Sequence, residues 1–196
     1  MFLAWKKTCV KKVKRIITQN FRLQAAILEF EKCRLLILNT YFPCDSQKLD
    51  LTLDETVELT NLFQDISSLL HEYDGAFDVP VILGDLNFDN LRFTAHTQMI
   101  NQFMEENSFF TAWEMFPIDF TFSNNQSRST IDHFLLPDKF ASTIIDARVV
   151  HDSENMSGHA PIYLQLDLLK SKNPVEKVER PPRLNWFYST KEQRQQ

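Results

Sequence analysis

Short apolar runs that end in small polar groups recur four times along this 196-residue chain. The clearest is residues 79–83, a run typical of a buried strand, which leads directly into the turn-forming residues 84–87. The other polar groups, at residues 39–43, 131–133 and 157–161, also lie at the ends of apolar runs. This recurring placement indicates a sheet whose strand ends carry the polar side chains.

Helical patterns alternate with these strand patterns. Residues 52–73 have apolar side chains at helical spacing, with Asp54 and Glu55 where a helix N-terminus favours negative charge. A second helix is predicted at 97–106. Further strands are predicted at 21–30, 34–39, 120–123, 131–136, 144–150 and 161–168. We expect 120–123 and 131–136 to pair as a hairpin. The interleaving predicts an α/β or α+β fold.

The length and composition favour one packed domain followed by a polar segment. The chain is 43% hydrophobic, with 17 Phe and only 3 Gly, which is unlike a disordered protein. After residue 168 the composition turns to Lys, Asn, Glu, Arg and Pro. We therefore assign residues 1–168 to the domain and 169–196 to a linker or tail.

The charge balance argues against nucleic-acid binding through bulk attraction. The formal net charge is −5, and DNA-binding proteins usually rely on clustered Lys and Arg. Basic residues do cluster near the start of the chain, at Lys6, Lys7, Lys11, Lys12, Lys14 and Arg15. A solvated strand or frayed terminus accounts for this cluster more simply than a DNA contact does. Any role with nucleic acid must rest on a local site.

Cysteine spacing and hydropathy indicate an intracellular protein. The three Cys residues form no Cys-x-x-Cys pair, which fits neither a disulfide framework nor a structural zinc site. The opening residues lack the order of a signal peptide, and no apolar stretch is long enough to cross a bilayer. We expect the protein to be neither secreted nor bound to a membrane.

Each polar group has an ordinary structural explanation when taken alone. An Asp-x-Asn sequence after a strand, such as Asp85 with Asn87, is usually only a turn. A pair such as Asp132 and His159 can be a structural hydrogen bond, and Tyr41 can be a half-buried strand aromatic. A serine hydrolase is disfavoured, because no Gly-x-Ser-x-Gly elbow is present and a Ser two residues from its His cannot easily face it.

Together and in order, the four groups resemble the motifs of the endonuclease/exonuclease/phosphatase superfamily. Those motifs are N-x-Y-x-P, G-D-x-N, I-D-[HY] and S-[DN]-H-x-P, and this chain has NTYFP at 39–43, GDLN at 84–87, IDH at 131–133 and SGHAP at 157–161. The resemblance covers about residues 5–168. It implies a four-layered α/β/β/α sandwich of the deoxyribonuclease I-like type and metal-dependent hydrolysis of phosphodiesters.

The resemblance also implies a role for each motif residue. Asp85 would position or deprotonate the attacking water and bind a metal ion, Mg2+ or alternatively Mn2+. Asn87 would hold a phosphate oxygen. His159, oriented by Asp132, would contact the scissile phosphate, and Tyr41 would hydrogen-bond near the leaving group. Asn39 and Ser157 fall within the motifs and are candidate substrate-binding residues.

Within the superfamily the chain most resembles the endonuclease domain of non-LTR retrotransposons. Thr121 lies in a T-F-S segment similar to the strand upstream of the I-D-H motif, and the loop that begins at Asn124 is similar to a DNA-contacting hairpin. Both residues are candidate DNA contacts. Residues 183–186 resemble the linker toward a reverse transcriptase in the parent polyprotein. This likeness implies DNA as the partner and, for a functional protein, a nuclear location.

Two departures from the family pattern lower the expected activity. Gly158 stands where the family usually has Asp or Asn. The family's first strand, with an Asn, and the following element, with the metal-binding Glu, should lie upstream of residues 2–6. We therefore expect a domain without its first strand-helix segment and weak or absent cleavage. The alternatives are a non-catalytic remnant that binds DNA or protein, an abasic-site repair nuclease, and an inositol-type phosphatase.

Overall fold

The structure is a computed structural model that describes residues 3–45, 51–124, 126–152 and 154–169. The two α-helices are α1 (Leu53–Glu72) and α2 (Ala95–Glu106). The strands are β1 (Lys12–Ile16), β2 (Leu23–Glu29), β3 (Arg34–Tyr41), β4 (Val79–Asp85), β5 (Phe109–Thr111), β6 (Phe122–Ser123), β7 (Arg128–Ser129), β8 (Asp132–Pro137), β9 (Ile144–Val149) and β10 (Ile162–Leu166). Two 3-10 helices, η1 (Ala112–Glu114) and η2 (Asp138–Thr143), complete the described elements.

A six-stranded sheet organises the molecule, with strand order β1-β2-β3-β4-β8-β5. Strands β3 and β4 are parallel, because the chain crosses back through α1 between them, and the other neighbours are antiparallel. Strands β9 and β10 form a second, two-stranded sheet, and β6 pairs with β7. The carboxyl ends of β3 and β4 therefore lie at the same end of the large sheet, beside the start of β8.

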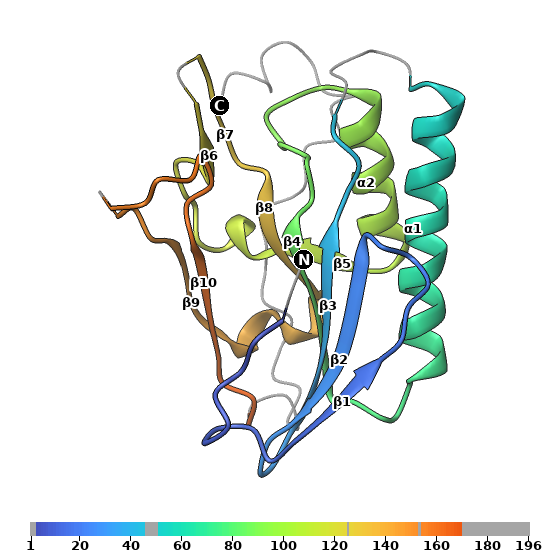
Figure 1. The fold of residues 1–196 in the computed structure, drawn as a ribbon, viewed down its shortest axis with the longest axis vertical. Coiled ribbons are helices and arrows are strands. Elements are labelled where there is room, and N and C mark those ends of the chain that lie inside the picture. Colours follow the sequence, from blue (N-terminus) through green and yellow to red (C-terminus); the bar gives the residue numbers. More distant parts are fainter. Residues whose placement is uncertain (1–2, 46–50, 125, 153, 170–196) are drawn as a thin grey trace.

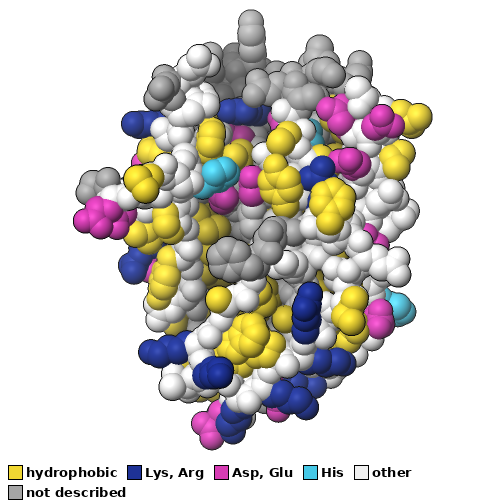
Figure 2. All heavy atoms as spheres, in the orientation of Figure 1, with side chains coloured by type: hydrophobic (Ala, Val, Ile, Leu, Met, Phe, Trp, Pro, Cys, Tyr) yellow, Lys and Arg dark blue, Asp and Glu magenta, His cyan; other side chains and the backbone are white. Residues whose placement is uncertain are grey.

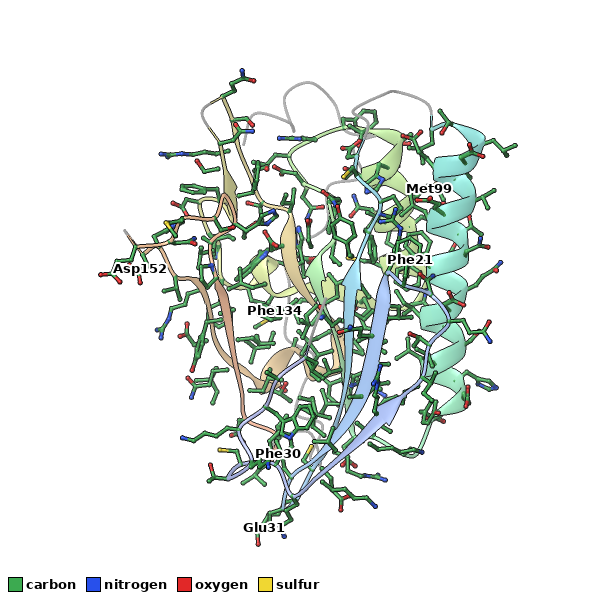
Figure 3. The ribbon with its side chains drawn as sticks, in the orientation of Figure 1. Phe21, Phe30, Glu31, Met99, Phe134 and Asp152 are labelled. Carbon is green, nitrogen blue, oxygen red and sulfur yellow. The ribbon has the colours of Figure 1, made fainter. Side chains whose placement is uncertain are left out.

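The large sheet is covered on both faces. Figure 1 shows α1 and α2 against one face, and the β9–β10 pair on the opposite side of the sheet. Side chains that alternate along each strand supply two apolar cores: Leu36 and Leu38 of β3 pack toward the helices, whereas Leu35 and Ile37 pack toward the small sheet. In Figure 3, Phe134 and Met99 lie on opposite sides of the sheet, in agreement with these two cores.

Local sequence explains the boundaries of α1. Thr52 caps the helix by accepting a hydrogen bond from the backbone N–H of Glu55, and the Glu55 carboxylate accepts the Thr52 N–H in return. The buried face consists of Leu59, Leu62, Ile66 and Leu69, which recur at helical spacing. No helix in the described ranges is long and apolar enough to cross a membrane.

The predicted mixed α/β class is confirmed, as are both helices and most strands. The predicted hairpin is wrong. Residues 122–123 pair with Arg128 and Ser129, whereas β8 pairs with β4 and β5 in the large sheet. Strand β5 was not predicted, because three residues are too few to show an alternating pattern. Of the predicted tail at 169–196, all but Leu169 lies outside the described residues.

Candidate active site

The strand register places three of the predicted residues side by side at one end of the large sheet. Tyr41 ends β3 directly opposite Asp85, the last residue of β4. Asp85 in turn lies opposite Asp132, the first residue of β8. Because neighbouring strands lie about 4.8 Å apart, the three side chains form a short row across β3, β4 and β8. Residues far apart in sequence thus meet through sheet pairing alone.

His159 extends this row beyond β8. Its Nδ1 lies 3.0 Å from Asp132 Oδ2 and 3.2 Å from Oδ1. The segment that carries His159 is held against β6 by a bridge between Phe122 and His159 and by the Ala160 N–H, which donates to the Thr121 carbonyl oxygen at 2.7 Å. With Nδ1 donating to the carboxylate, Nε2 remains available to a substrate atom.

Thr121 fixes the position of Asp132. Its hydroxyl oxygen accepts hydrogen bonds from the backbone N–H groups of Ile131 and Asp132, each at 3.0 Å, and the residue is fully buried. A contact between Thr121 and DNA stays a prediction; in this structure two backbone donors engage its hydroxyl and protein surrounds the side chain. It is a positioning residue for the Asp132–His159 pair.

Asp85 is a half-buried carboxylate at the end of β4. Burial raises its pKa to about 6 from an ordinary value of 3.8, and the neighbouring Asp132 adds to the increase. The Asn87 N–H, which donates to Asp85 Oδ1 at 3.0 Å, and the nearby His159 oppose the shift. Two adjacent carboxyl groups in a partly buried setting favour either a shared proton or a bound cation.

Gly84 makes this geometry possible. It has a φ of +132°, and a Cβ at this position would lie 2.0 Å from the backbone oxygen of Thr40 and 3.2 Å from Asn39 Oδ1. A side chain here would push β4 away from β3 at the point where Tyr41 and Asp85 meet. The predicted Asn39 lies in β3 opposite Leu83, two positions before Asp85 in the register, with its Oδ1 close to Gly84.

Asn87 and Tyr41 close the β3 side of the row. Asn87 has a φ of +49°, a left-handed conformation that Asn tolerates, and its Nδ2 donates to the Phe42 carbonyl oxygen at 2.9 Å. The Tyr41 hydroxyl lies 3.7 Å from Cys44 Sγ. This hydrogen bond with Cys44 is the main cause of a raised Tyr41 pKa, which the Asn87 side chain partly offsets. The phenol therefore keeps its proton at neutral pH.

The remaining predicted contacts lie at the margin of this site. Asn124 is exposed at the turn between β6 and β7, and its Oδ1 accepts the N–H groups of Gln126 and Ser127. Ser157 is exposed, and its Oγ accepts the His159 N–H at 3.1 Å. Both side chains thus shape the local backbone while they face solvent. The structure does not bring Asn124 into contact with the row.

Steric contacts explain why position 158 is occupied by glycine. A Cβ at this position would lie 2.9 Å from Cε2 of Phe122 and 3.1 Å from the Ser123 carbonyl oxygen. The Phe122 ring also lies 4.9 Å from the His159 ring. A side chain at position 158 would therefore collide with the Phe122 ring and the backbone of Ser123.

His133, from the same motif as Asp132, is structural. Its Nε2 lies 2.9 Å from the Phe88 carbonyl oxygen and 3.0 Å from that of Thr130, and its Nδ1 lies 3.1 Å from Thr111 Oγ1. Two carbonyl acceptors require hydrogen on Nε2, so Nδ1 accepts the Thr111 hydroxyl. Complete burial lowers its pKa. This structural role of His133 could not be predicted from the sequence, because its three hydrogen-bond partners come from three separate segments.

A divalent cation fits part of this site. Asp85 and Asp132 offer adjacent carboxylates, and the partial burial of Asp85 beside Asp132 favours a positive charge at this place. Mg2+ needs only one or two carboxylates when water and substrate oxygens supply its other ligands. Across the described residues, however, no group of three or more His, Cys, Asp or Glu side chains could hold a metal ion.

The surface reflects this arrangement. In Figure 2, a histidine, acidic side chains, hydrophobic side chains and a basic side chain follow one another across the upper half of this face. Most basic side chains of this face gather at the lower end of the view, and others lie along its upper edge, above that row.

Comparisons by sequence find no relative: no protein-family model and no curated protein matches the chain. Comparison of structures does find similar proteins. AP endonuclease LMAP from Leishmania major superposes with a TM-score of 0.56 at 15% identity, over 75% of this chain and 55% of that one. This chain therefore spans about half of the length of that enzyme.

Two other solved structures also have a similar fold. The 3′ phosphatase NExo from Neisseria has a TM-score of 0.57 at 16% identity, over 81% of this chain and 71% of that one. The endonuclease domain of TRAS1, a telomere-specific non-LTR retrotransposon, has a TM-score of 0.60 at 13% identity, over 80% of this chain and 69% of that one. From the mixed α/β architecture and these superpositions, the chain has the same fold as these three proteins.

Proposed function

We propose that this chain hydrolyses phosphodiester bonds in DNA with the help of a divalent cation, as a nicking endonuclease of retroelement origin. The observation that carries the proposal is the row formed by Tyr41, Asp85, Asp132 and His159. It combines a carboxylate whose pKa lies near neutrality with an imidazole oriented by a second carboxylate.

Each residue has a part that its geometry supports. Asp85, as a carboxylate, would orient an attacking water and accept its proton at the free oxygen, since Oδ1 already accepts the Asn87 N–H. Asp132 holds His159 at Nδ1 and so orients the ring, and His159 Nε2 would contact an oxygen of the scissile phosphate. The protonated Tyr41 would donate near the leaving oxygen.

A bound Mg2+ or Mn2+ ion would supply Lewis-acid polarisation of the phosphate. Asp85 is the residue that would hold it, with Asp132 next to it in the register. The Asn87 amide, which donates to the Phe42 carbonyl oxygen, would hold a phosphate oxygen when substrate is bound.

DNA is proposed as the substrate because the proteins of similar fold are an AP endonuclease, the endonuclease domain of a non-LTR retrotransposon and a phosphatase that was solved with a product DNA hairpin. The T-F-S segment and the loop at 124–130 favour the retrotransposon type over an abasic-site nuclease or an inositol-type phosphatase. A reverse transcriptase in the parent polyprotein and a nuclear site of action belong to this proposal.

The test is nicking of supercoiled plasmid at low salt in Mg2+ and in EDTA. We expect Mg2+-dependent nicking that Asp85→Ala abolishes. Asp74→Ala is the matched control, because Asp74 is an exposed acidic residue in the turn after α1. Nicking that persists in Asp85→Ala, or that needs no metal, would contradict the proposed roles.

A non-catalytic DNA- or protein-binding remnant is the second candidate. One observation favours it: the described residues offer no group of three metal-ligating side chains. A weakly held cation would give slow cleavage or none. Soluble, folded protein that binds DNA in EDTA but produces no nicks at any Mg2+ or Mn2+ concentration would select this candidate over the enzyme.

A further inference from the structure

An exposed aromatic ring continues the candidate active-site row by one more strand. The backbone N–H of Tyr41 donates to the Arg22 carbonyl oxygen at 2.9 Å, so the residues just before β2 lie next to Tyr41. Phe21, the preceding residue, is 81% exposed. Figure 3 shows Phe21 at the start of β2, on the side of the sheet nearer α1.

Arg22 fixes this ring in relation to Tyr41. Its guanidinium carbon lies 5.1 Å from the centroid of the Phe21 ring and 5.4 Å from that of Tyr41. Arg22 also donates to Glu58 of α1 at 3.0 Å, and only 17% of its side chain is exposed. We call Phe21, Arg22 and Tyr41 the aromatic ledge.

The turn before the ledge is anchored as well. Asn20 Oδ1 accepts the Arg22 N–H at 3.0 Å, while Asn20 Nδ2 donates to Asp65 of α1 at 2.8 Å. Two contacts with α1 therefore hold this short segment in one conformation. A ligand that bound the ledge would meet a surface that is already ordered, which lowers the entropic cost of binding.

Phe21 contacts Arg22, yet most of its ring surface is left in water, where burial against a ligand would be favourable. The net charge of −5 also means that binding to DNA gains little from bulk attraction. Stacking of a base on an aromatic ring does not depend on charge, and it contributes affinity regardless of the base.

The position of the ledge sets which base it can meet. Phe21 lies two residues before β2, the strand that is two places from β4 and Asp85, so about 10 Å separates the two backbones at a strand spacing of about 4.8 Å. One strand of B-form DNA advances about 3.4 Å per nucleotide, so this distance corresponds to roughly three nucleotides. In a closed duplex, both faces of a base are covered by its neighbours.

We propose that the aromatic ledge binds an unpaired nucleobase, stacked on Phe21, a few nucleotides from the cleaved bond. This inference rests on the proposed function, because it takes DNA as the substrate. It adds that the preferred DNA has an unpaired base at this place, as in a single strand, a frayed end or a bubble.

Binding is measured by fluorescence anisotropy in EDTA, with a labelled single-stranded oligonucleotide and a fully paired duplex of the same sequence. We expect Phe21→Ala to weaken single-strand binding by about 5- to 100-fold, the range for loss of one stacked base. Phe21→Trp should restore it, and duplex binding should change less than twofold. Ile17→Ala is the matched control, because Ile17 is 88% exposed in the same connection.

A second arm locates the stacked base. A series of oligonucleotides, each lacking one base, should bind the wild type more weakly at a single position of the series. In Phe21→Ala this dependence should disappear, since the partner of the missing base is absent. Equal single-strand binding by wild type and Phe21→Ala overturns the inference. If that wild type still nicks plasmid in Mg2+, the proposed function stands; if wild type neither binds nor nicks DNA, both fail.

Discussion

At the scale of single residues, the candidate site carries a cost in stability. The Asp85 carboxyl is buried beside Asp132, and its pKa of about 6 lies above its ordinary value of 3.8. A raised carboxyl pKa means that the folded protein holds the proton more tightly than the unfolded chain does. Stability is therefore highest below pH 3.8 for this group, and it falls as pH rises from 3.8 through 6.

Asp85→Asn should stabilise the metal-free protein at pH 7. The amide keeps an oxygen for the Asn87 N–H but carries no charge to desolvate. From 1.36 kcal/mol per pKa unit, reduced for partial solvent screening, we expect a gain of about 1–2 kcal/mol. Urea unfolding in EDTA measures it. The gain should shrink toward pH 4, and a variant that is less stable than wild type at pH 7 would contradict this account.

Gly84→Ala should disrupt the fold. The new Cβ would lie 2.0 Å from the Thr40 oxygen in a backbone at φ +132°, so β3 and β4 would have to separate. We expect a loss of more than about 4 kcal/mol, or no folded protein. Gly75→Ala is the control: it has a φ of +75° with nothing within 4 Å, so it should cost only about 1 kcal/mol. Thermal melts of the two variants check the contrast.

At the scale of elements, the short β6–β7 hairpin supports the site. Thr121, just before β6, accepts the N–H groups that lead into β8, and its own carbonyl oxygen accepts the Ala160 N–H beside His159. One residue thus connects the two segments that bring Asp132 and His159 together. Its effect on chemistry is indirect, through the spacing of those two side chains.

Thr121→Val should leave two buried N–H groups unpaired, at a cost of about 1–3 kcal/mol. Nicking should fall more than substrate binding does, because the Asp132–His159 pair loses its alignment. Thr121→Ser keeps the hydroxyl and should restore most of the nicking rate. Kinetics at varied plasmid concentration, together with melting temperatures, separate the two effects. A Val variant with full activity would show that the hydroxyl does not position the pair.

The sequence predicts those elements that carry their own local signal. Helix α1 has a capping residue and a repeated apolar face, and β3 and β4 are continuous apolar runs, so each was predictable. Pairing was not predictable for β6, because two residues at a turn contain no information about their partner. The roles of Thr121 and His133 were also hidden, since each depends on backbone atoms from distant segments.

At the scale of the whole molecule, charge limits how DNA can be bound. The net charge is −5, and the exposed basic residues Lys11, Lys12, Lys14 and Arg15 lie on or beside the edge strand β1. In the pairing of β1 with β2, Lys12 lies opposite Glu29, the last residue of β2. Phe21 precedes the first residue of β2, so Lys12 and Phe21 lie at opposite ends of this strand. The basic cluster of β1 is therefore not placed to neutralise phosphates near the row.

We expect a shallow salt dependence of DNA binding. Each phosphate neutralised contributes about −0.9 to the slope of log affinity against log salt concentration, so a few contacts give a slope of magnitude below about 4. Lys12→Gln should leave this slope unchanged. Titrations in EDTA at several KCl concentrations provide the measurement. A slope near −8, lowered by Lys12→Gln, would show that the β1 edge binds DNA after all.

The division into a large and a small sheet has a dynamic consequence. His159 lies in the segment between β9 and β10, outside the six-stranded sheet that holds Tyr41, Asp85 and Asp132. A partial opening that releases β9 and β10 would dismantle the site while the large sheet stays folded. Amide hydrogen exchange should therefore be faster in β9 and β10 than in β3 and β4, and DNA that bridges His159 and Tyr41 should slow it. Substrate binding is then coupled to the local folding of the small sheet, because only the folded form holds His159 beside Asp132.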